Sequence, residues 1–191
     1  RAEREAAEEV ASDIREKGGR AAAVQADVGA EGDVVRLFEE AGRLWPGVPL
    51  TALVNNAGVV DRLKLDEVNT LTFDAAFHTN VLGPLLCCRE FAKKASDGSA
   101  VVNISSGSAV LCTGQYGMTK GALNSMQAWL VKDLAAKGIR INSVSPGMTE
   151  TDMIADVKEG FDMRQIPLGR FGTPAEIADA VEFLLSDKSL Y

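Results

Sequence analysis

The sequence predicts an α/β fold in which helices cover both faces of one parallel sheet, a doubly wound arrangement. Three observations lead to this prediction. Short apolar runs of strand length alternate with amphipathic stretches of helix length. The chain has 191 residues, which fits one domain, and 46% of them are hydrophobic, enough for a sizeable core. No repeat, low-complexity tract or linker divides the sequence, so we treat residues 1–191 as a single domain.

The first part of the chain should form two helices and two strands. Apolar residues recur at helical spacing over 3–17 and 31–45, and Gly18-Gly19 ends the first of these helices. Residues 20–27 have the composition of a short strand. The continuous apolar run Leu50–Asn55 predicts a strand that is buried on both faces.

The rest of the chain continues the alternation. We expect helices over 72–94 and 116–137, and strands over 99–105 and 139–145. A last helix starts with Thr173 as its cap, Pro174 in its first turn and Glu176 at its third position, a capping box. Because strands that alternate with long helices pair in parallel through right-handed crossovers, the sheet should be parallel.

Polar and glycine-rich residues follow four predicted strands at their carboxyl ends. They are Asp27, the NNAG run at 55–58, the SSG run at 105–107 and Pro146-Gly147. Asparagine and glycine occur in any turn, so one such cluster would mean little. In a doubly wound sheet, however, ligands bind outside the carboxyl ends of the strands. Four clusters at the same edge predict a ligand site.

Tyr116 and Lys120 are the candidate proton-transfer residues. They lie four residues apart on a predicted helix, so their side chains share one face. A phenol with a pKa of about 10 is a poor base at neutral pH, and a nearby ammonium would stabilise its phenolate. Such a pair suits general acid–base chemistry on an alcohol or carbonyl. For an isolated pair, a tyrosine packed over a lysine stem is the ordinary alternative.

Two further polar residues extend this candidate site. Ser106 closes a strand ten residues before Tyr116, where its hydroxyl could hydrogen-bond a substrate oxygen; a plain turn serine is the alternative. Asn80 lies in the otherwise apolar stretch 77–86, where burying an amide without a partner is costly. A local hydrogen bond that bends its own helix is the alternative for Asn80.

Composition excludes several classes of function. The 20 basic and 27 acidic residues give a net charge of −7, which argues against nucleic-acid and anionic-membrane binding. No apolar run approaches the ~20 residues of a membrane span, and the charged, alanine-rich start is unlike a signal peptide. The three cysteines show no CxxC spacing and no histidine cluster, which predicts neither a metal site nor a disulfide framework; they are Cys87, Cys88 and Cys112. We therefore expect a reduced, cytoplasmic protein.

Several motifs, taken in order, resemble those of the classical short-chain dehydrogenase/reductase family. They are NNAG at 55–58, NVLG at 80–83, NISS at 103–106, YGMTK at 116–120 and SPGMTET at 145–151. The resemblance implies a Rossmann-like fold and an NAD(P)-dependent oxidoreductase that interconverts a secondary alcohol and a ketone. The substrate would be a small-molecule alcohol or ketone, and the segment after Thr151 would be a mobile substrate lid.

The resemblance also implies a role for each residue of the site. Tyr116 would be the acid/base and Lys120 would lower its pKa. Ser106 would orient the substrate oxygen, and Asn80 would hold a water in a proton relay. The implied cofactor-binding residues are Asp27 and Val28 near the adenine, Asn55, Ala57 and Gly58 near its ribose, and Tyr116, Lys120, Pro146, Gly147, Met148 and Thr151 around the nicotinamide.

The sequence departs from the family pattern in two respects. The family begins with a glycine-rich phosphate-binding βα unit and ends in a further strand, and residues 1–191 contain neither. We therefore expect a sheet that is incomplete at both ends, in which the strand at 20–27 lacks its usual neighbours. The spacing from serine to tyrosine is also shorter than usual, which makes Ser108 a second candidate for the role of Ser106.

Three questions stay open at this level. A catalytically inactive binding or assembly subunit is the alternative function, because the phosphate-binding unit is missing. The cofactor is NADP or NAD: the charge of Arg1 slightly favours NADP, and a solvated arginine at a helix start is the alternative. A homodimer or homotetramer formed through 72–94 and 116–137 is implied, with four apolar residues either at that interface or in the core: Leu123, Met126, Trp129 and Leu130.

Overall fold

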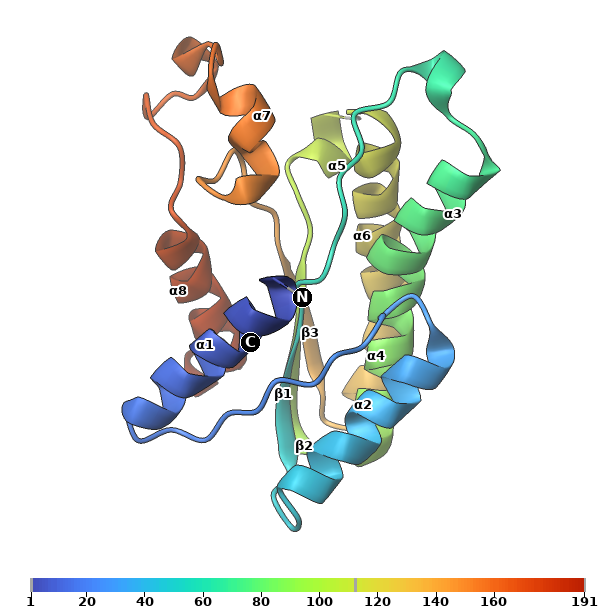
Figure 1. The fold of residues 1–191 in the computed structure, drawn as a ribbon. Coiled ribbons are helices and arrows are strands. Elements are labelled where there is room, and N and C mark those ends of the chain that lie inside the picture. Colours follow the sequence, from blue (N-terminus) through green and yellow to red (C-terminus); the bar gives the residue numbers. More distant parts are fainter. Residues whose placement is uncertain (1, 112, 191) are drawn as a thin grey trace.

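The computed structural model describes residues 2–111 and 113–190; Arg1 and Cys112, considered above, lie outside them. Its sheet has three parallel strands in the order β1-β2-β3, which are Leu50–Asn55, Ala95–Ile104 and Arg140–Val144. Figure 1 shows α2, α4 and α6 on one side of the sheet and α8 on the other; they span Glu31–Leu44, Gly83–Lys94, Gly114–Ala135 and Pro174–Leu185. The prediction of a parallel, doubly wound α/β fold is confirmed.

The remaining helices are shorter or lie at the margins. They are α1 at Ala2–Glu16, α3 at Thr70–Phe77, α5 at Ser108–Leu111 and α7 at Ala155–Lys158. Single 3₁₀ turns occupy Leu65–Glu67, Asp152–Ile154, Met163–Gln165 and Asp187–Ser189. The helix predicted over 72–94 is α3 and α4 joined by a π-helical turn at His78–Leu82. The capping box of Thr173 and Glu176 forms as predicted. None of the helices in the described part of the chain is long and apolar enough to cross a membrane.

The prediction of a strand at 20–27 is wrong. These residues run extended but join no sheet within the described residues, and they cross the molecule between α1 and α2 (Figure 1). An extended segment becomes a strand only when a neighbour takes up its backbone hydrogen bonds. Here helical side chains do so instead: Arg15 donates to the Ala21 carbonyl at 3.0 Å and Arg36 to the Gln25 carbonyl at 2.7 Å.

Burial on both faces holds for β2 and not for β1. Ala100, Val101 and Val102 of the central strand β2 are completely buried between the helices. Strand β1 is an edge strand, and its Val54 is 40% exposed. The prediction that Leu50–Asn55 is covered on both faces is therefore wrong, because α8 contacts β2 and β3 on its side of the sheet.

Helix α6 supplies much of the core. Leu123, Met126 and Leu130 are 1%, 7% and 9% exposed and pack against α4 and the sheet. Trp129 is 63% exposed. Of the four residues that could serve either core or interface, three thus belong to the core.

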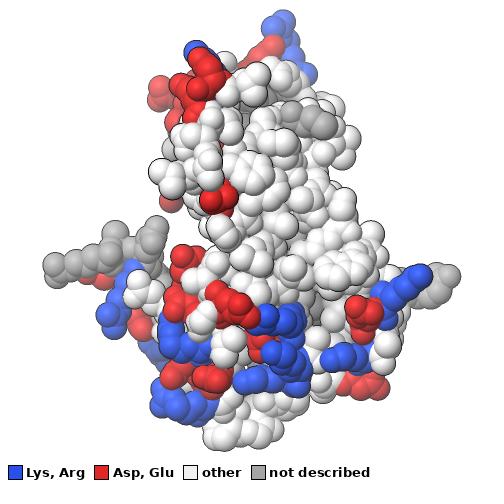
Figure 2. All heavy atoms as spheres, turned by 90° about the vertical axis from the view of Figure 1, so that its right-hand side faces the viewer, with Lys and Arg blue, Asp and Glu red and all other residues white. Residues whose placement is uncertain are grey.

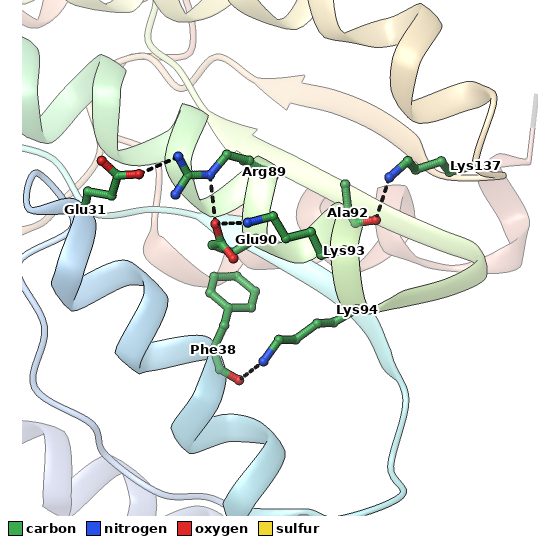
Figure 3. A network of polar contacts seen from close by, with 8 residues as sticks. All are labelled: Glu31, Phe38, Arg89, Glu90, Ala92, Lys93, Lys94 and Lys137. Atoms are coloured by element: carbon green, nitrogen blue, oxygen red, sulfur yellow. Dashed lines mark hydrogen bonds and ion pairs between the residues drawn. The ribbon is translucent and has the colours of Figure 1, made fainter.

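A buried carboxylate joins the charged side chains of α4 (Figure 3). Glu90 is 4% exposed and accepts from Lys93 at 2.7 Å and from Arg89 at 2.8 Å. Arg89 also pairs with Glu31 of α2 at 2.6 Å. The hydrogen bond from Lys93 is the main cause that holds the pKa of Glu90 below its usual range, and burial opposes it. This network fixes α2 against α4.

Two lysines attach α4 to its neighbours through carbonyl oxygens, as Figure 3 also shows. Lys94 donates to Phe38 of α2, and Lys137 beyond α6 donates to Ala92, each at 3.0 Å. Ala92 lies in the last turn of α4, where the helix leaves carbonyl oxygens unpaired, so the Lys137 ammonium satisfies one of them. Phe38 lies in the middle of α2, and its carbonyl accepts from Lys94 in addition to its bond within the helix. Both contacts lie at the end of α4 that is remote from Asn80.

We expect Glu90→Gln to lower the free energy of unfolding by about 2 kcal/mol, because it removes a charged acceptor shared by two cations. The pKa of Glu90 is lowered in the fold, so this stabilisation is present above its ordinary pKa of 4.5. It is lost as the pH falls through the folded-state value. Urea unfolding at several pH values measures both effects. Glu40→Gln, which breaks the exposed pair with Arg43, is the matched control; an equal loss there would contradict the prediction.

Candidate active site

Tyr116 and Lys120 lie together in the first turns of α6, as their spacing predicts. The Lys120 ammonium is 5.6 Å from the centroid of the Tyr116 ring. Lys120 is only 4% exposed, and its Nζ donates to the carbonyl of Ile104 at 2.7 Å. The lysine therefore links the start of α6 to the carboxyl end of β2.

Burial controls the protonation of both residues. It lowers the pKa of Lys120 to about 8, because the charged ammonium loses its hydration. It also raises the pKa of Tyr116, and a hydrogen bond with Ser106 acts in the opposite direction. The Lys120 ammonium is directed to the Ile104 carbonyl, and the role of Lys120 in lowering the pKa of Tyr116 stays a prediction.

Ser106, rather than Ser108, adjoins Tyr116. Ser106 follows β2 and shares a hydrogen bond with the tyrosine. Ser108 begins α5, and its backbone N–H donates to the Ser106 hydroxyl at 3.1 Å. The short connection between the serine and Tyr116 thus still places Ser106 beside the phenol.

Asn80 is 1% exposed and lies in the π-helical turn between α3 and α4. Its amide oxygen accepts from the Val59 N–H at 2.8 Å, and its amide nitrogen donates to the Val59 carbonyl at 2.8 Å and to Thr119 at 3.0 Å. These partners belong to the loop after β1 and to α6, so the alternative of a bond within its own helix does not hold. π-Helical turns of this kind occur often at functional sites.

Sequence reasoning missed Thr119 and Val59. The Thr119 hydroxyl is completely buried and donates to the Tyr116 carbonyl at 2.7 Å while it accepts from Asn80. Thr119 falls inside the YGMTK motif, three residues after Tyr116, and this helical spacing could have identified it from the sequence. Val59 acts only through its backbone, which no side-chain pattern reveals.

Gly58 allows the loop after β1 to approach the site. A Cβ atom on Gly58 would lie 3.3 Å from the Asn80 amide oxygen and 3.6 Å from the Lys120 ammonium. The absence of a side chain therefore leaves space directly beside both functional groups.

Three of the five residues predicted to bind the adenosine line a cavity of about 130 Å³; Asp27 and Gly58 are not among its lining residues. Val28, Asn55 and Ala57 line it, together with Gly83. A Cβ on Gly83 would lie 2.9 Å from Val28, so this glycine is needed for close packing. Asp27 accepts from the Gly29 N–H at 2.9 Å, just before α2. The Asn55 amide turns inward and donates to Asn103 at 2.8 Å, so it joins the ends of β1 and β2.

The residues predicted to flank the nicotinamide follow β3. The Pro146 carbonyl accepts from Gly107 at 2.9 Å, which brings this loop against the one that carries Ser106. Met148 accepts from Gly172 at 2.9 Å, and Gly147 accepts from the Thr149 hydroxyl at 3.2 Å. The Thr151 hydroxyl donates to the Thr149 carbonyl at 3.5 Å, and Thr151 is an exposed residue.

The chain matches known proteins over its whole length. A family model for enoyl-(acyl carrier protein) reductases matches residues 1–191. An uncharacterized oxidoreductase of Escherichia coli strain K12, YgfF, is 36% identical over 200 residues, which cover 97% of this chain and 80% of that protein. A crystal structure of a short-chain dehydrogenase from Burkholderia cenocepacia in complex with NADP has a TM-score of 0.91 at 26% identity, covering 97% and 78% of the two chains. The angucycline C-6 ketoreductase LanV with bound NADP has a TM-score of 0.89 at 34% identity, covering 97% and 76%.

The fold and these matches define an oxidoreductase built on a Rossmann-type α/β domain. The chain belongs to the short-chain dehydrogenase/reductase family. The resemblance inferred from the ordered motifs is confirmed.

Because Lys120 titrates at a lower pH in the fold than in the unfolded chain, it should make stability pH-dependent. Between the folded pKa of about 8 and the ordinary value of 10.5, the unfolded chain binds more protons, so the free energy of unfolding should rise with pH. Urea unfolding of the wild type and Lys120→Met from pH 7 to 10 tests this. The free energy of unfolding of the wild type, relative to that of Lys120→Met, should increase as the pH rises. A difference that does not change with pH would contradict the lowered pKa of Lys120.

Proposed function

We propose that the protein interconverts a secondary alcohol and a ketone with NADP or NAD, and that Tyr116 is the acid/base. One observation carries the proposal: the Tyr116 phenol, the Lys120 ammonium and the Ser106 hydroxyl converge at the carboxyl ends of the strands. A ketone oxygen placed there meets a hydroxyl donor and a proton donor at once. NADP is favoured, since two similar solved structures contain it.

The residues present fit such a cofactor on two sides. The cavity lined by Val28, Asn55 and Ala57 is available on the adenosine side. Gly58 leaves open the space beside Lys120, where a ribose hydroxyl could accept from the ammonium. Pro146, Gly147, Met148 and Thr151 would flank the nicotinamide, which supplies or accepts the hydride when it is bound.

Near neutral pH the site holds the proton that reduction of a ketone requires. Since burial raises the pKa of Tyr116, the phenol keeps its proton and can donate it to the oxygen of the developing alkoxide. The Ser106 hydroxyl would hydrogen-bond the same oxygen and orient the carbonyl. Lys120 would bind the ribose, and Asn80, whose amide oxygen has a second lone pair, would hold a water that re-supplies the proton.

Tyr116→Phe should abolish turnover and leave nucleotide affinity largely intact, because it removes only the transferable proton. Ser106→Ala should lower turnover strongly, whereas the matched control Ser108→Ala should retain it. Ketone-dependent loss of NADPH absorbance and calorimetric nucleotide titration measure the two properties. If the folded wild type binds neither nucleotide, the protein is instead an inactive binding or assembly subunit. Retained turnover in Tyr116→Phe would remove Tyr116 from its role.

We also propose that the protein self-associates through α4 and α6, as a homodimer or homotetramer. The support is Trp129, a 63% exposed aromatic side chain of α6, together with the exposed Met118 and Val131 of the same helix. Trp129→Ser should reduce the sedimentation mass of the assembly. Trp45→Ser on α2's end is the control, and equal effects of the two changes would argue against this face.

A further inference from the structure

The loop that follows β1 contacts three parts of the site within four residues. Val59 pairs with Asn80 through its backbone. Asp61 accepts from Gln115, the residue before Tyr116, and Arg62 reaches the segment after Thr151. Asp61 and Arg62 are adjacent, so their backbones cannot move independently.

Asp61 holds the first turn of α6. The Gln115 side-chain nitrogen donates to Asp61 at 2.6 Å and to the Thr72 carbonyl at 2.9 Å, and Gln115 is 3% exposed. Because Gln115 adjoins Tyr116 in the chain, a displacement of Asp61 would change the position of the tyrosine backbone.

Arg62 holds the segment Asp152–Lys158, which comprises a 3₁₀ turn and α7. It donates to the Met153 carbonyl at 3.0 Å and pairs with Asp156 at 3.0 Å. The first contact joins residues that are 91 positions apart in the sequence. Together the two contacts hold both the 3₁₀ turn and α7. In Figure 1, α7 lies at the same end of the molecule as α5 and the start of α6.

Asp61 and Gln115 share one hydrogen bond, and each also has a side-chain oxygen that takes no part in it. Asp61 Oδ1 and Gln115 Oε1 are buried and lack a hydrogen-bond partner among the described residues. Both oxygens are shielded from solvent, so the contact between Asp61 and Gln115 lies inside the protein.

We propose that Asp61 and Arg62 are positioning residues that couple the Asp152–Lys158 segment to Tyr116. The segment, held by Arg62, keeps the loop in place, and Asp61 then keeps the first turn of α6 and its tyrosine in place. Opening of the segment releases both and lets water reach the phenol. This proposal rests on the proposed function only in taking Tyr116 as the acid of the reaction.

The test compares Arg62→Met with Arg164→Met. Both remove one arginine charge, but Arg164 pairs only with the nearby Asp162 among the contacts described. Arg62→Met should accelerate amide hydrogen exchange over 152–158, and Arg164→Met should not. Asp156→Asn breaks the same ion pair from the other side and should act like Arg62→Met, which covers the case of a poorly folded Arg62 variant.

Titration of Tyr116 distinguishes coupling from a local role. The chain has two tyrosines, so tyrosinate absorbance minus that of Tyr116→Phe isolates this residue. Burial raises the Tyr116 pKa, and coupling predicts that Arg62→Met lowers it as water enters. Simple loss of the positive charge of Arg62 would instead raise the Tyr116 pKa, so the sign of the shift decides in the Arg62→Met variant. An unchanged or raised pKa in both Arg62→Met and Asp156→Asn would overturn the proposal.

Activity provides a further check that does not depend on the first two. In ketone reduction, Arg62→Met should raise KM several-fold and Asp61→Asn should lower kcat about tenfold, a cost typical of small misplacements. The double variant should lose less kcat/KM than the product of the single losses. A multiplicative result would contradict the coupling. If the wild type reduces no ketone, the proposed function fails, while exchange and titration still decide the coupling.

Discussion

The buried amide of Asn80 has to find hydrogen-bond partners, and it finds them on two segments distant in sequence. It bonds to Val59 in the loop after β1 and to Thr119 on α6, and Thr119 in turn bonds to the Tyr116 carbonyl. An unpaired amide in this place would be costly, so the loop, the π-helical turn and the helix are held in one arrangement. The positions of Gly58, Lys120 and Tyr116 follow from it.

Within this frame, burial favours the uncharged form of both titratable groups. The pKa of Lys120 is lowered to about 8 and that of Tyr116 is raised. A tyrosine that retains its proton, next to a serine hydroxyl, is equipped to donate to an oxygen that becomes negative. This protonation supports the proposed reduction of a ketone, and the proposed coupling through Asp61 and Arg62 would connect the Asp152–Lys158 segment to the phenol.

Prediction from sequence succeeded where the signal is local and failed where it depends on strand pairing. Helices whose apolar faces repeat regularly, such as α2 and α6, were predicted to within a few residues, because their pattern is local. The strand at 20–27 was predicted from its composition, but pairing requires a neighbour that the described residues do not offer it. Strand β1 was expected to be covered on both faces. It is an edge strand instead, because the position of a strand in the sheet depends on its neighbours and not on its own composition.

The sequence by itself determined the alternation of helices and parallel strands, the capping of α8, the shared face of Tyr116 and Lys120 and the membership of the family. These depend on spacing and short motifs. Only the tertiary structure decided that Ser106 rather than Ser108 adjoins Tyr116, which partners Asn80 takes, and that Leu123, Met126 and Leu130 belong to the core while Trp129 is exposed. Burial and hydrogen bonding there depend on residues far apart in the chain, and no local pattern encodes which of them meet.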